Sequence, residues 1–449
     1  MKKEDQYYLY LILFHVFIGA LGYILPFTSK IYGYSIFIFG VYYIIKTQNR
    51  NNEALVVAAY VVGSEVFLRM TGGNPLYEIS KYGVMVFILL GMYYSGFSKG
   101  AAPYWTFLLL LVPSVVISTF ALNFDTDIRK AIAFNISGPV CLGIASLYTF
   151  RRKISLEETN SILLSLGLPI ISCMVYLTLY TPNVQEVITG TESNFQTSGG
   201  YGPNQVATIL GLGMFIFFSR IILDSKTKFQ ILINIIIALN ITYRGMITFS
   251  RGGMITGFLM IVLLLAFLYF KSNFGGRVKL NYIIVLLTLA MFATWSYTSF
   301  QTGGLIEKRY SNRDAKGRVK ESQFTGREDV AQNEIDTFFK NPIFGVGVGK
   351  GAEIREDETG LKVLSHDEIT RMLAEHGSLG ILALLILFFT PLVLYLENKF
   401  NMFLLCFVAF WFLTINHAAM RTAVPAFVYS LSLLNVQLGS PRRVKNEEE

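Results

Sequence analysis

The sequence predicts an all-α integral membrane protein that crosses the bilayer many times. Of its 449 residues, 53% are hydrophobic and only 15% are charged, a balance far too apolar for an ordinary soluble protein. Apolar segments near or above the roughly 17 residues of a spanning helix recur about fourteen times. One long polar stretch, at 299–377, interrupts them late in the chain. We therefore expect about 12 to 14 transmembrane helices and one large, partly helical external loop near the C-terminus.

The expected spans follow one another through short connections. They lie approximately at 7–26, 32–46, 54–69, 82–97, 104–122, 131–150, 162–180, 204–223, 228–243, 251–271, 281–298, 378–396, 401–417 and 422–438. Several are short or polar, and the third contains Glu65 and Arg69. A carboxylate is costly at membrane depth, so Glu65 is expected to face protein or water.

Lysine and arginine in the short connections predict the orientation of the chain. With Lys2 and Lys3 in the cytoplasm, every second connection is basic, whereas the opposite ones carry less positive charge. This bias places 299–377 outside. The net charge of +8 is thus mainly a topology signal, and no nucleic-acid partner is expected. We divide the chain into a scaffold at 1–203, helices with an S-R-G-G motif at 204–298, the external catalytic loop at 299–377, helices at 378–438 and a cytoplasmic tail at 439–449.

His366 is the leading candidate for a chemical centre. Ser365 and Glu368 have the S-x-x-E spacing of a capping box, which predicts a helix with His366 at its first position and an end at Gly377. Unpaired N–H groups at a helix start favour anions and disfavour a second proton on an imidazole. His366 is thus expected to be a neutral base beside a bound phosphate.

Two arginines are candidates for holding that phosphate. Arg251 begins the span at 251–271, where it either snorkels to the interface or presents its planar fork to phosphate oxygens. Arg327 opens a segment with helical spacing that Asn341 and Pro342 end. The apolar face of that segment should lie on the protein or membrane surface and so fix the position of Arg327.

Further cations lie on the same expected side of the membrane. The basic run from Lys308 to Lys320 includes Arg309, Arg313 and Arg318, and it suits either anionic groups or solvent. His417 and Arg421 fall in the short connection between the last two spans. They are expected at the surface, with a phosphate contact or a second proton carrier as the alternative.

Other motifs give weaker signals. Asn204 follows a glycine-rich turn and is expected to cap the next span, with a role in lining a site as the alternative. Asp125 and Asp127 form a D-x-D, which can hold a divalent ion, although a solvated loop explains it as well. The glycines at 345–351 match no nucleotide-binding spacing, so they indicate a flexible or tightly turned connection. The acidic residues at 353–358 are expected to be solvated. The three cysteines have no metal-ligand spacing.

With these motifs in view, the chain resembles the O-antigen ligase and polymerase superfamily, polytopic enzymes that act on undecaprenyl-pyrophosphate-linked glycans outside the bacterial inner membrane. The resemblance rests on S-R-G-G at 250–253, the late external loop, G-R at 326–327 followed by N-P-I-F-G-V-G-V-G, and H-x10-G-x-x-G from His366 through Gly377 and Gly380. It covers roughly 199–394. Asp367 departs from the Asn, Ser or Gln usual in ligases, and an acid there would raise the basicity of His366 or orient it.

The resemblance implies an inverting glycosyl transfer that needs no metal, nucleotide or other cofactor. It implies that Arg251 and Arg327 hold the pyrophosphate and that His366 positions or deprotonates the acceptor hydroxyl. The expected partners are an undecaprenyl-pyrophosphate-linked glycan donor, a lipid A-core or other glycan acceptor, and membrane lipid. The expected location is the bacterial inner membrane, with a periplasmic active site. Further candidate substrate contacts are Asp367, Arg309, Arg313, Arg318, Asn204 and Arg421.

A ligase is the leading hypothesis, and three alternatives stay open. A polysaccharide polymerase would use the same donor but extend another lipid-linked repeat, and a protein O-oligosaccharyltransferase would transfer to a protein hydroxyl. A flippase for lipid-linked glycans is the alternative from another class. Transporters commonly have repeated halves, whereas this sequence has no such repeat and places its single long loop late.

Overall fold

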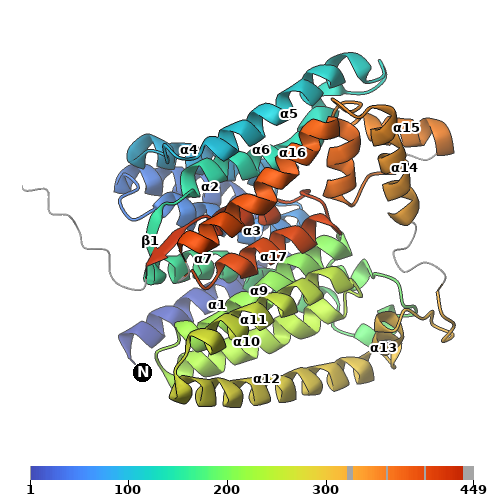
Figure 1. The fold of residues 1–449 in the computed structure, drawn as a ribbon. Coiled ribbons are helices and arrows are strands. Elements are labelled where there is room, and N and C mark those ends of the chain that lie inside the picture. Colours follow the sequence, from blue (N-terminus) through green and yellow to red (C-terminus); the bar gives the residue numbers. More distant parts are fainter. Residues whose placement is uncertain (1, 321–326, 361–362, 399–400, 438–449) are drawn as a thin grey trace, which may run out of the picture.

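The computed structural model describes residues 2–320, 327–360, 363–398 and 401–437, and nearly all of its ordered elements are helices (Figure 1). Nine helices in this described part are long and apolar enough to cross a membrane. The expected class, an all-α polytopic membrane protein, is confirmed. Four of these helices contain an internal proline, namely Pro113, Pro139, Pro169 and Pro391, which membrane helices tolerate where neighbouring groups satisfy the freed backbone carbonyls.

The first half of the chain forms a scaffold of long helices joined by short turns. Its elements are α1 (Lys3–Ile24), α2 (Phe27–Thr47), α3 (Glu53–Met70), α4 (Ile79–Ser95), α5 (Ala102–Ala121), α6 (Ile128–Thr149), β1 (Lys153–Ser155), α7 (Leu156–Tyr180), α8 (Val184–Val187) and a 3₁₀ turn (Gln196–Ser198).

The second half adds four long helices, the external segment and the C-terminal helices. These elements are α9 (Pro203–Leu223), α10 (Lys228–Met246), α11 (Arg251–Lys271), α12 (Phe274–Gln301), α13 (Leu305–Tyr310), α14 (Arg327–Lys340), α15 (Lys350–Thr359), α16 (Glu368–Glu397), α17 (Leu404–Ile415), α18 (Ala423–Leu431) and β2 (Asn435–Gln437).

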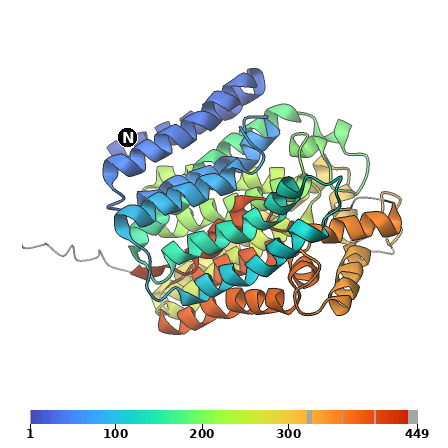
Figure 2. The same ribbon diagram turned by 90° about the horizontal axis from the view of Figure 1, so that it is seen from above.

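The helices run roughly side by side, so the molecule has two distinct ends. The N-terminus and β1 lie at one end, and α13, α14 and α15 lie at the other (Figure 1). Seen from above, α1 borders the bundle while α14 and α15 again sit at the far end (Figure 2). We call the end that carries α13 to α15 the loop end.

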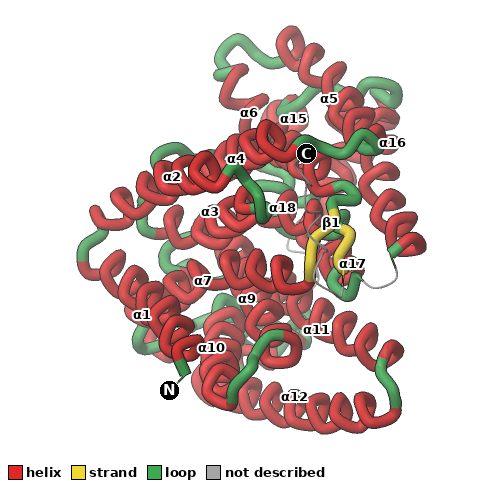
Figure 3. The backbone as a smooth tube through the Cα atoms, turned by 90° about the vertical axis from the view of Figure 1, so that its left-hand side faces the viewer, coloured by secondary structure: helices red, strands yellow, loops and turns green. Residues whose placement is uncertain are grey.

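The last expected span is wrong in its form. Residues 422–438 do not make one long helix, because α18 has only 9 residues and is followed by a turn and β2. β2 pairs in parallel with β1, in the register Lys153↔Asn435, at the end opposite the loop end (Figure 3). Such a short helix is stable here because all of its residues are buried among its neighbours.

The start of α16 also differs from the prediction. The capping residue is Asp367, whose carboxylate accepts from Ile369 N at 2.8 Å, so the helix begins at Glu368 and His366 precedes it. Ser365 bonds elsewhere and forms no capping box. The helix end predicted at Gly377 is a kink, because this residue has φ 61° and ψ −142° and α16 continues beyond it to Glu397. Glycine adopts that backbone without the steric cost that a side chain brings.

Candidate functional site

The S-R-G-G motif starts α11 at the loop end, and it holds two of the predicted arginines together. Arg251 Nη1 donates to the carbonyl of Arg309 at 3.3 Å. Arg309 in turn donates from Nε to the carbonyl of Phe249 at 2.9 Å. Phe249 has φ 59°, so the chain turns sharply just before the helix. α13 and the start of α11 are thus cross-linked through two guanidinium groups.

Gly252 of the same motif supports His417 from the connection between α17 and α18. A Cβ on Gly252 would lie 2.8 Å from ring atoms of His417, so only glycine leaves room for the imidazole. His417 Nδ1 lies 2.8 Å from Leu413 O, and Nε2 lies 3.2 Å from Thr208 Oγ1. Since a carbonyl can only accept, Nδ1 carries a proton. His417 is half-buried, which differs from the expected surface placement.

Asn204 lies beside the motif but does not cap α9. That helix has Gly202 at its N-cap and Pro203 at its first position. Proline occupies the first position because its missing N–H is not needed there. The Asn204 side chain instead accepts from Ser250 Oγ at 2.8 Å. The predicted capping role of Asn204 is therefore wrong, and its side chain lies beside the S-R-G-G motif.

Arg421 connects the α17–α18 connection to the segment that carries His366. Its Nη2 donates to the carbonyl of Ser365, the residue directly before His366. Its guanidinium also lies 5.9 Å from the centre of the Phe134 ring. Among the described residues, no carboxylate forms a direct ion pair with it. Burial lowers the pKa of this guanidinium, as expected for a cation removed from water.

A buried carboxylate of α14 holds the peptide around His366. Glu334 accepts from Ser365 Oγ at 3.1 Å and from Thr370 Oγ1 at 2.7 Å, on either side of His366. It also pairs with Arg355 of α15, at 2.9 Å. Burial raises the pKa of Glu334, and the hydrogen bonds and Arg355 oppose that shift. The sequence did not predict this role of Glu334, because the helical spacing of the segment indicates only where its apolar face lies.

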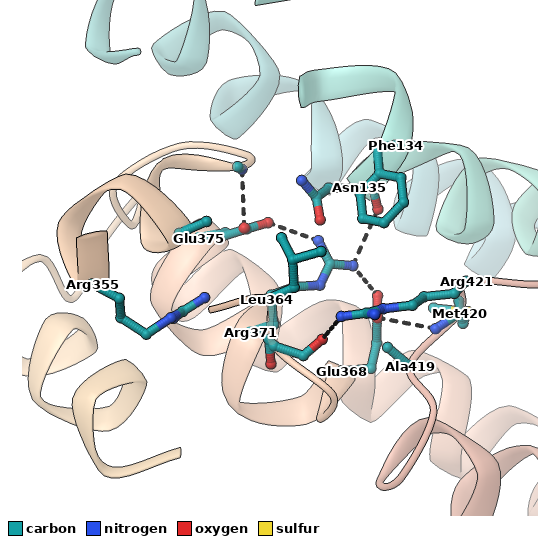
Figure 4. A pocket seen from close by; sticks show the side chains of 13 residues that line it. Phe134, Asn135, Arg355, Leu364, Glu368, Arg371, Glu375, Ala419, Met420 and Arg421 are labelled. Atoms are coloured by element: carbon teal, nitrogen blue, oxygen red, sulfur yellow. Dashed lines mark hydrogen bonds and ion pairs between the residues drawn. The ribbon is translucent and has the colours of Figure 1, made fainter. Parts of the chain in front are cut away.

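α16 carries a second set of buried charges. Arg371 pairs with both Glu368 and Glu375, and it donates to Asn135 O at 3.1 Å (Figure 4). Glu368 also accepts from Met420 N at 3.3 Å, and Glu375 accepts from Gly349 N at 2.9 Å. The E-x-x-R-x-x-x-E spacing on one helix face was a readable signal for this cluster.

The glycine-rich loop at 341–349 lies on the kink of α16. Ser378 N donates to Pro342 O at 2.8 Å, and Val346 N donates to Ala374 O at 3.0 Å. A Cβ on Gly345 would lie 2.4 Å from Glu375 backbone atoms, and one on Gly377 would lie 2.6 Å from Gly345 N. The loop is therefore tightly turned, one of the two forms expected, and its glycines permit backbone-to-backbone contact.

The basic run is divided between two environments. Arg309 turns inward, as described above. Arg313 and Arg318 are exposed on a turn closed by the bridge Arg313↔Val319, and Arg318 pairs with Asp314 at 2.7 Å. Neither arginine takes part in the contacts described above for Arg251 or for the segment that carries His366.

Arg327 and Asp367 complete the set of predicted residues. The backbone of Arg327 begins α14, but its side chain lies outside the described residues, as do Gly326 and Thr325. Asp367 accepts from Ile369 N and so holds the start of α16. Burial raises the pKa of Asp367.

Two hollows adjoin this cluster. A cavity of about 30 Å³ is lined by Ser365, Arg371 and Arg421, among others. It shares Phe134, Asn135, Gly349, Ala352 and Leu364 with an open groove of about 380 Å³ that reaches the turn between α5 and α6. We call the larger hollow the α6–α15 groove. Its volume lies within the roughly 300–1,000 Å³ typical of small-molecule sites.

Only some of the acidic residues near this groove are solvated as expected. Asp125 and Asp127 are exposed, and Asp127 caps α6 by accepting from Lys130 N at 3.0 Å. Glu353 was expected in solvent, but it is buried and accepts from Lys350 Nζ at 2.7 Å and from the backbone N of Asn123. Within the described residues, no group of His, Cys, Asp or Glu is placed to hold a metal ion.

Comparison with protein families gives one match. Residues 233–385 match the family model described as O-Antigen ligase (Wzy_C). The chain contains an O-antigen ligase domain. No curated protein matches the chain.

The O-antigen ligase domain includes Arg251, Arg309, Arg327, His366 and Asp367. The contacts described above extend beyond it, because Asn204 lies before its first residue and Arg421 after its last. Both contact residues of the domain directly, Ser250 in one case and Ser365 in the other. The candidate site is therefore assembled from the domain and from helices outside it.

Proposed function

We propose that the protein transfers a glycan from undecaprenyl pyrophosphate to an acceptor hydroxyl, by inversion and without a metal ion, at the periplasmic face of the bacterial inner membrane. The observation that carries the proposal is a pair of contacts made by the short connection at 416–422. His417 packs on Gly252, next to Arg251, and Arg421 donates to the carbonyl of Ser365, next to His366. The O-antigen ligase domain supports lipid-linked glycans as the substrate class.

The arginines suit a diphosphate leaving group. As the bond between the anomeric carbon and the phosphate oxygen breaks, the departing diphosphate takes the electron pair and gains charge. Guanidinium groups held in place stabilise such charge best where water is scarce. Arg421 has no direct ion pair among the described residues, so an anion would supply the partner that it lacks. Arg251 and Arg327 are assigned the same task.

His366 is assigned the role of general base. Its imidazole would accept the proton of the acceptor hydroxyl while that oxygen attacks the anomeric carbon from the face opposite the diphosphate. A single displacement of this kind inverts the configuration at that carbon. Glu334 favours the geometry, because its bonds to Ser365 and Thr370 limit movement of the peptide that carries the base.

The two substrates have separate hollows available. An apolar groove of about 330 Å³ lies between α16 and α17, and it runs from Ile369, near His366, to Ile415, near His417. It contains no polar surface and suits a polyprenyl chain. The α6–α15 groove, with Asp125, Lys130 and Phe134 in its lining, suits the acceptor sugar. Aromatic rings can pack on a sugar ring while charged groups bind its hydroxyls.

The test uses purified protein in nanodiscs with an undecaprenyl-pyrophosphate-linked glycan and a lipid A-core acceptor. Wild type should release undecaprenyl pyrophosphate and form glycosylated acceptor. His366→Ala should lower kcat by about 10²- to 10⁴-fold, the usual contribution of a general base. Full transfer by this variant would refute the assignment of His366.

The acceptor decides among the transferase alternatives. Transfer to a second lipid-linked repeat, but not to lipid A-core, would indicate a polymerase, and transfer to a serine or threonine of a protein would indicate an O-oligosaccharyltransferase. Movement of the donor across the bilayer without any transfer would indicate a flippase.

A further inference from the structure

A buried ion pair in the N-terminal scaffold reaches the connection that carries Arg421. Glu65 and Arg69 lie one turn apart on α3, with Glu65 Oε1 2.7 Å from Arg69 Nη2. Glu65 is 0% exposed. Buried charges are costly unless they are paired and hydrogen-bonded. Neither residue has a part in the proposed transfer, so the contacts of the pair indicate what other role it has.

Both members of the pair bond to the backbone around Arg421. Arg69 Nη2 donates to the carbonyl of Arg421 at 3.2 Å. Glu65 Oε2 accepts from the backbone N of Ala423 at 2.7 Å. The connection is therefore fixed at two backbone points, one on either side of Thr422. Charge-assisted hydrogen bonds of this kind are stronger than neutral ones.

Arg69 also fixes two other segments of the loop end. Its Nη2 donates to Tyr77 O at 3.1 Å, and its Nη1 donates to the Tyr201 hydroxyl at 3.1 Å. The guanidinium lies 4.3 Å from the centre of the Tyr77 ring. Tyr201 donates onward to Gln205 in the first turn of α9, at 2.6 Å. Only a planar fork with several donors can make all of these bonds at once.

We propose that Glu65 and Arg69 are positioning residues that hold Arg421 toward the pyrophosphate of the donor. The inference rests on the proposed function, because it takes Arg421 as a contact of that pyrophosphate. Arg69 acts through the carbonyl of Arg421 and touches no substrate. The guanidinium of Arg421 is thereby held between its own fixed backbone and the carbonyl of Ser365.

The chain offers a matched control pair. Glu78 and Lys81 form another buried ion pair of the scaffold, and both bond to Ser137 of α6. Among the described residues, neither makes a hydrogen bond to the connection at 416–422. If the two buried pairs only stabilise the scaffold, variants of either pair should lower stability without changing turnover per folded molecule.

The experiment is a double-mutant cycle on transfer in nanodiscs, with kcat and KM expressed per folded molecule. Arg69→Lys keeps the charge but loses the fork, and it should lower kcat/KM by about 10- to 100-fold, as displacement of a reacting group by about 1 Å can. Glu65→Gln, which keeps the shape and the acceptor for Ala423 N, should act in the same direction. Lys81→Met should leave turnover per folded molecule unchanged.

The interaction between variants gives the sharpest readout. If Arg69 acts through Arg421, the double variant Arg69→Lys/Arg421→Lys should be no slower than Arg421→Lys alone. In combination with Arg251→Lys, the losses should multiply. Wild-type rates in Arg69→Lys, full multiplication with Arg421→Lys, or an equal loss in Lys81→Met would each overturn the inference and leave the proposed function intact. Wild-type protein that transfers no glycan would overturn both.

Discussion

Gly252 shows, at the scale of one residue, why the S-R-G-G motif contains glycine. Any side chain at this position would enter the space of the His417 ring, which lies within 2.8 Å of the Cβ site. The observed position of the imidazole therefore requires that residue 252 has no Cβ. Through His417, the glycine couples the start of α11 to the connection that carries Arg421.

Gly252→Ala should displace the His417 ring and break its contact with Thr208. A lost hydrogen bond of this kind costs about 0.5 to 1.5 kcal/mol, so the protein should stay folded. Transfer should fall by about 10- to 100-fold, because the connection shifts relative to Arg251. Rates and thermal unfolding of the purified variant check both statements.

Gly190→Ala is the matched control, because nothing lies within 4 Å of a Cβ at that position. It should behave as wild type. If Gly252→Ala also transfers at the wild-type rate, the contact between Gly252 and His417 has no part in the reaction.

At the scale of elements, α16 and the loop at 341–349 depend on each other. Gly377 breaks the helix, and the break exposes the Ala374 and Glu375 carbonyls to Val346 N and Gly347 N. The N-P-I-F-G-V-G-V-G motif at 341–349 and the H-x10-G-x-x-G motif at 366–380 thus form one structural unit. Together with Glu334, this unit fixes the approach of the chain to His366.

Gly377→Ala should disrupt that unit. At φ 61° and ψ −142° a residue other than glycine costs about 1 to 3 kcal/mol, and here its Cβ would also collide with Gly345 N at 2.6 Å. Thermal unfolding should shift to lower temperature and transfer should be lost. Gly351→Ala, inside α15, should be neutral or slightly stabilising, because the nearest atom to its Cβ would be Arg355 Nη1 of the same helix, at an ordinary contact distance of 3.5 Å. Equal behaviour of the two variants would contradict this view of the kink.

The contact between α15 and the turn that joins α5 to α6 should depend on pH, because the Glu353 carboxylate makes it. Burial opposes the change, but bonds from Lys350, Thr126 and Asn123 prevail and lower the pKa of this carboxyl below its ordinary 4.5. A lowered carboxyl pKa adds stability that is present above the unfolded value and is lost as the pH falls through the folded value. The contact should therefore be intact at neutral pH and weaken below about pH 4.5.

The measurement compares wild type with Glu353→Gln by thermal unfolding between pH 3 and 7, on either side of the ordinary glutamate pKa of 4.5. The difference in Tm should be largest near neutral pH and should shrink on acidification. Asp357→Asn, an exposed acid on the same helix, is the control and should show little difference. A difference that grows at low pH would contradict the assignment.

At the scale of the whole molecule, local patterns were predictable and long-range partners were not. The span at 251–271 coincides with α11, and the helix end predicted at Gly377 coincides with the kink of α16, because apolar length and glycine act within the segment itself. The partners of Glu65, the role of Glu334 and the orientation of Arg421 were not predictable. Each depends on partners far away in the sequence, such as Ala423 for Glu65, and only the folded chain brings them together.

The two ends of the molecule make the orientation testable. Arg313 is exposed and follows α13, which lies at the loop end, whereas Lys99 lies in a connection predicted to face the cytoplasm. The native thiols of Cys141, Cys173 and Cys406 are all buried, so they should give little background. In intact spheroplasts, Arg313→Cys should react with a membrane-impermeant maleimide, and Lys99→Cys should react only after the membrane is opened. The reverse pattern would put the candidate site in the cytoplasm, where a periplasmic acceptor cannot reach it, and the proposed transfer would have to be abandoned.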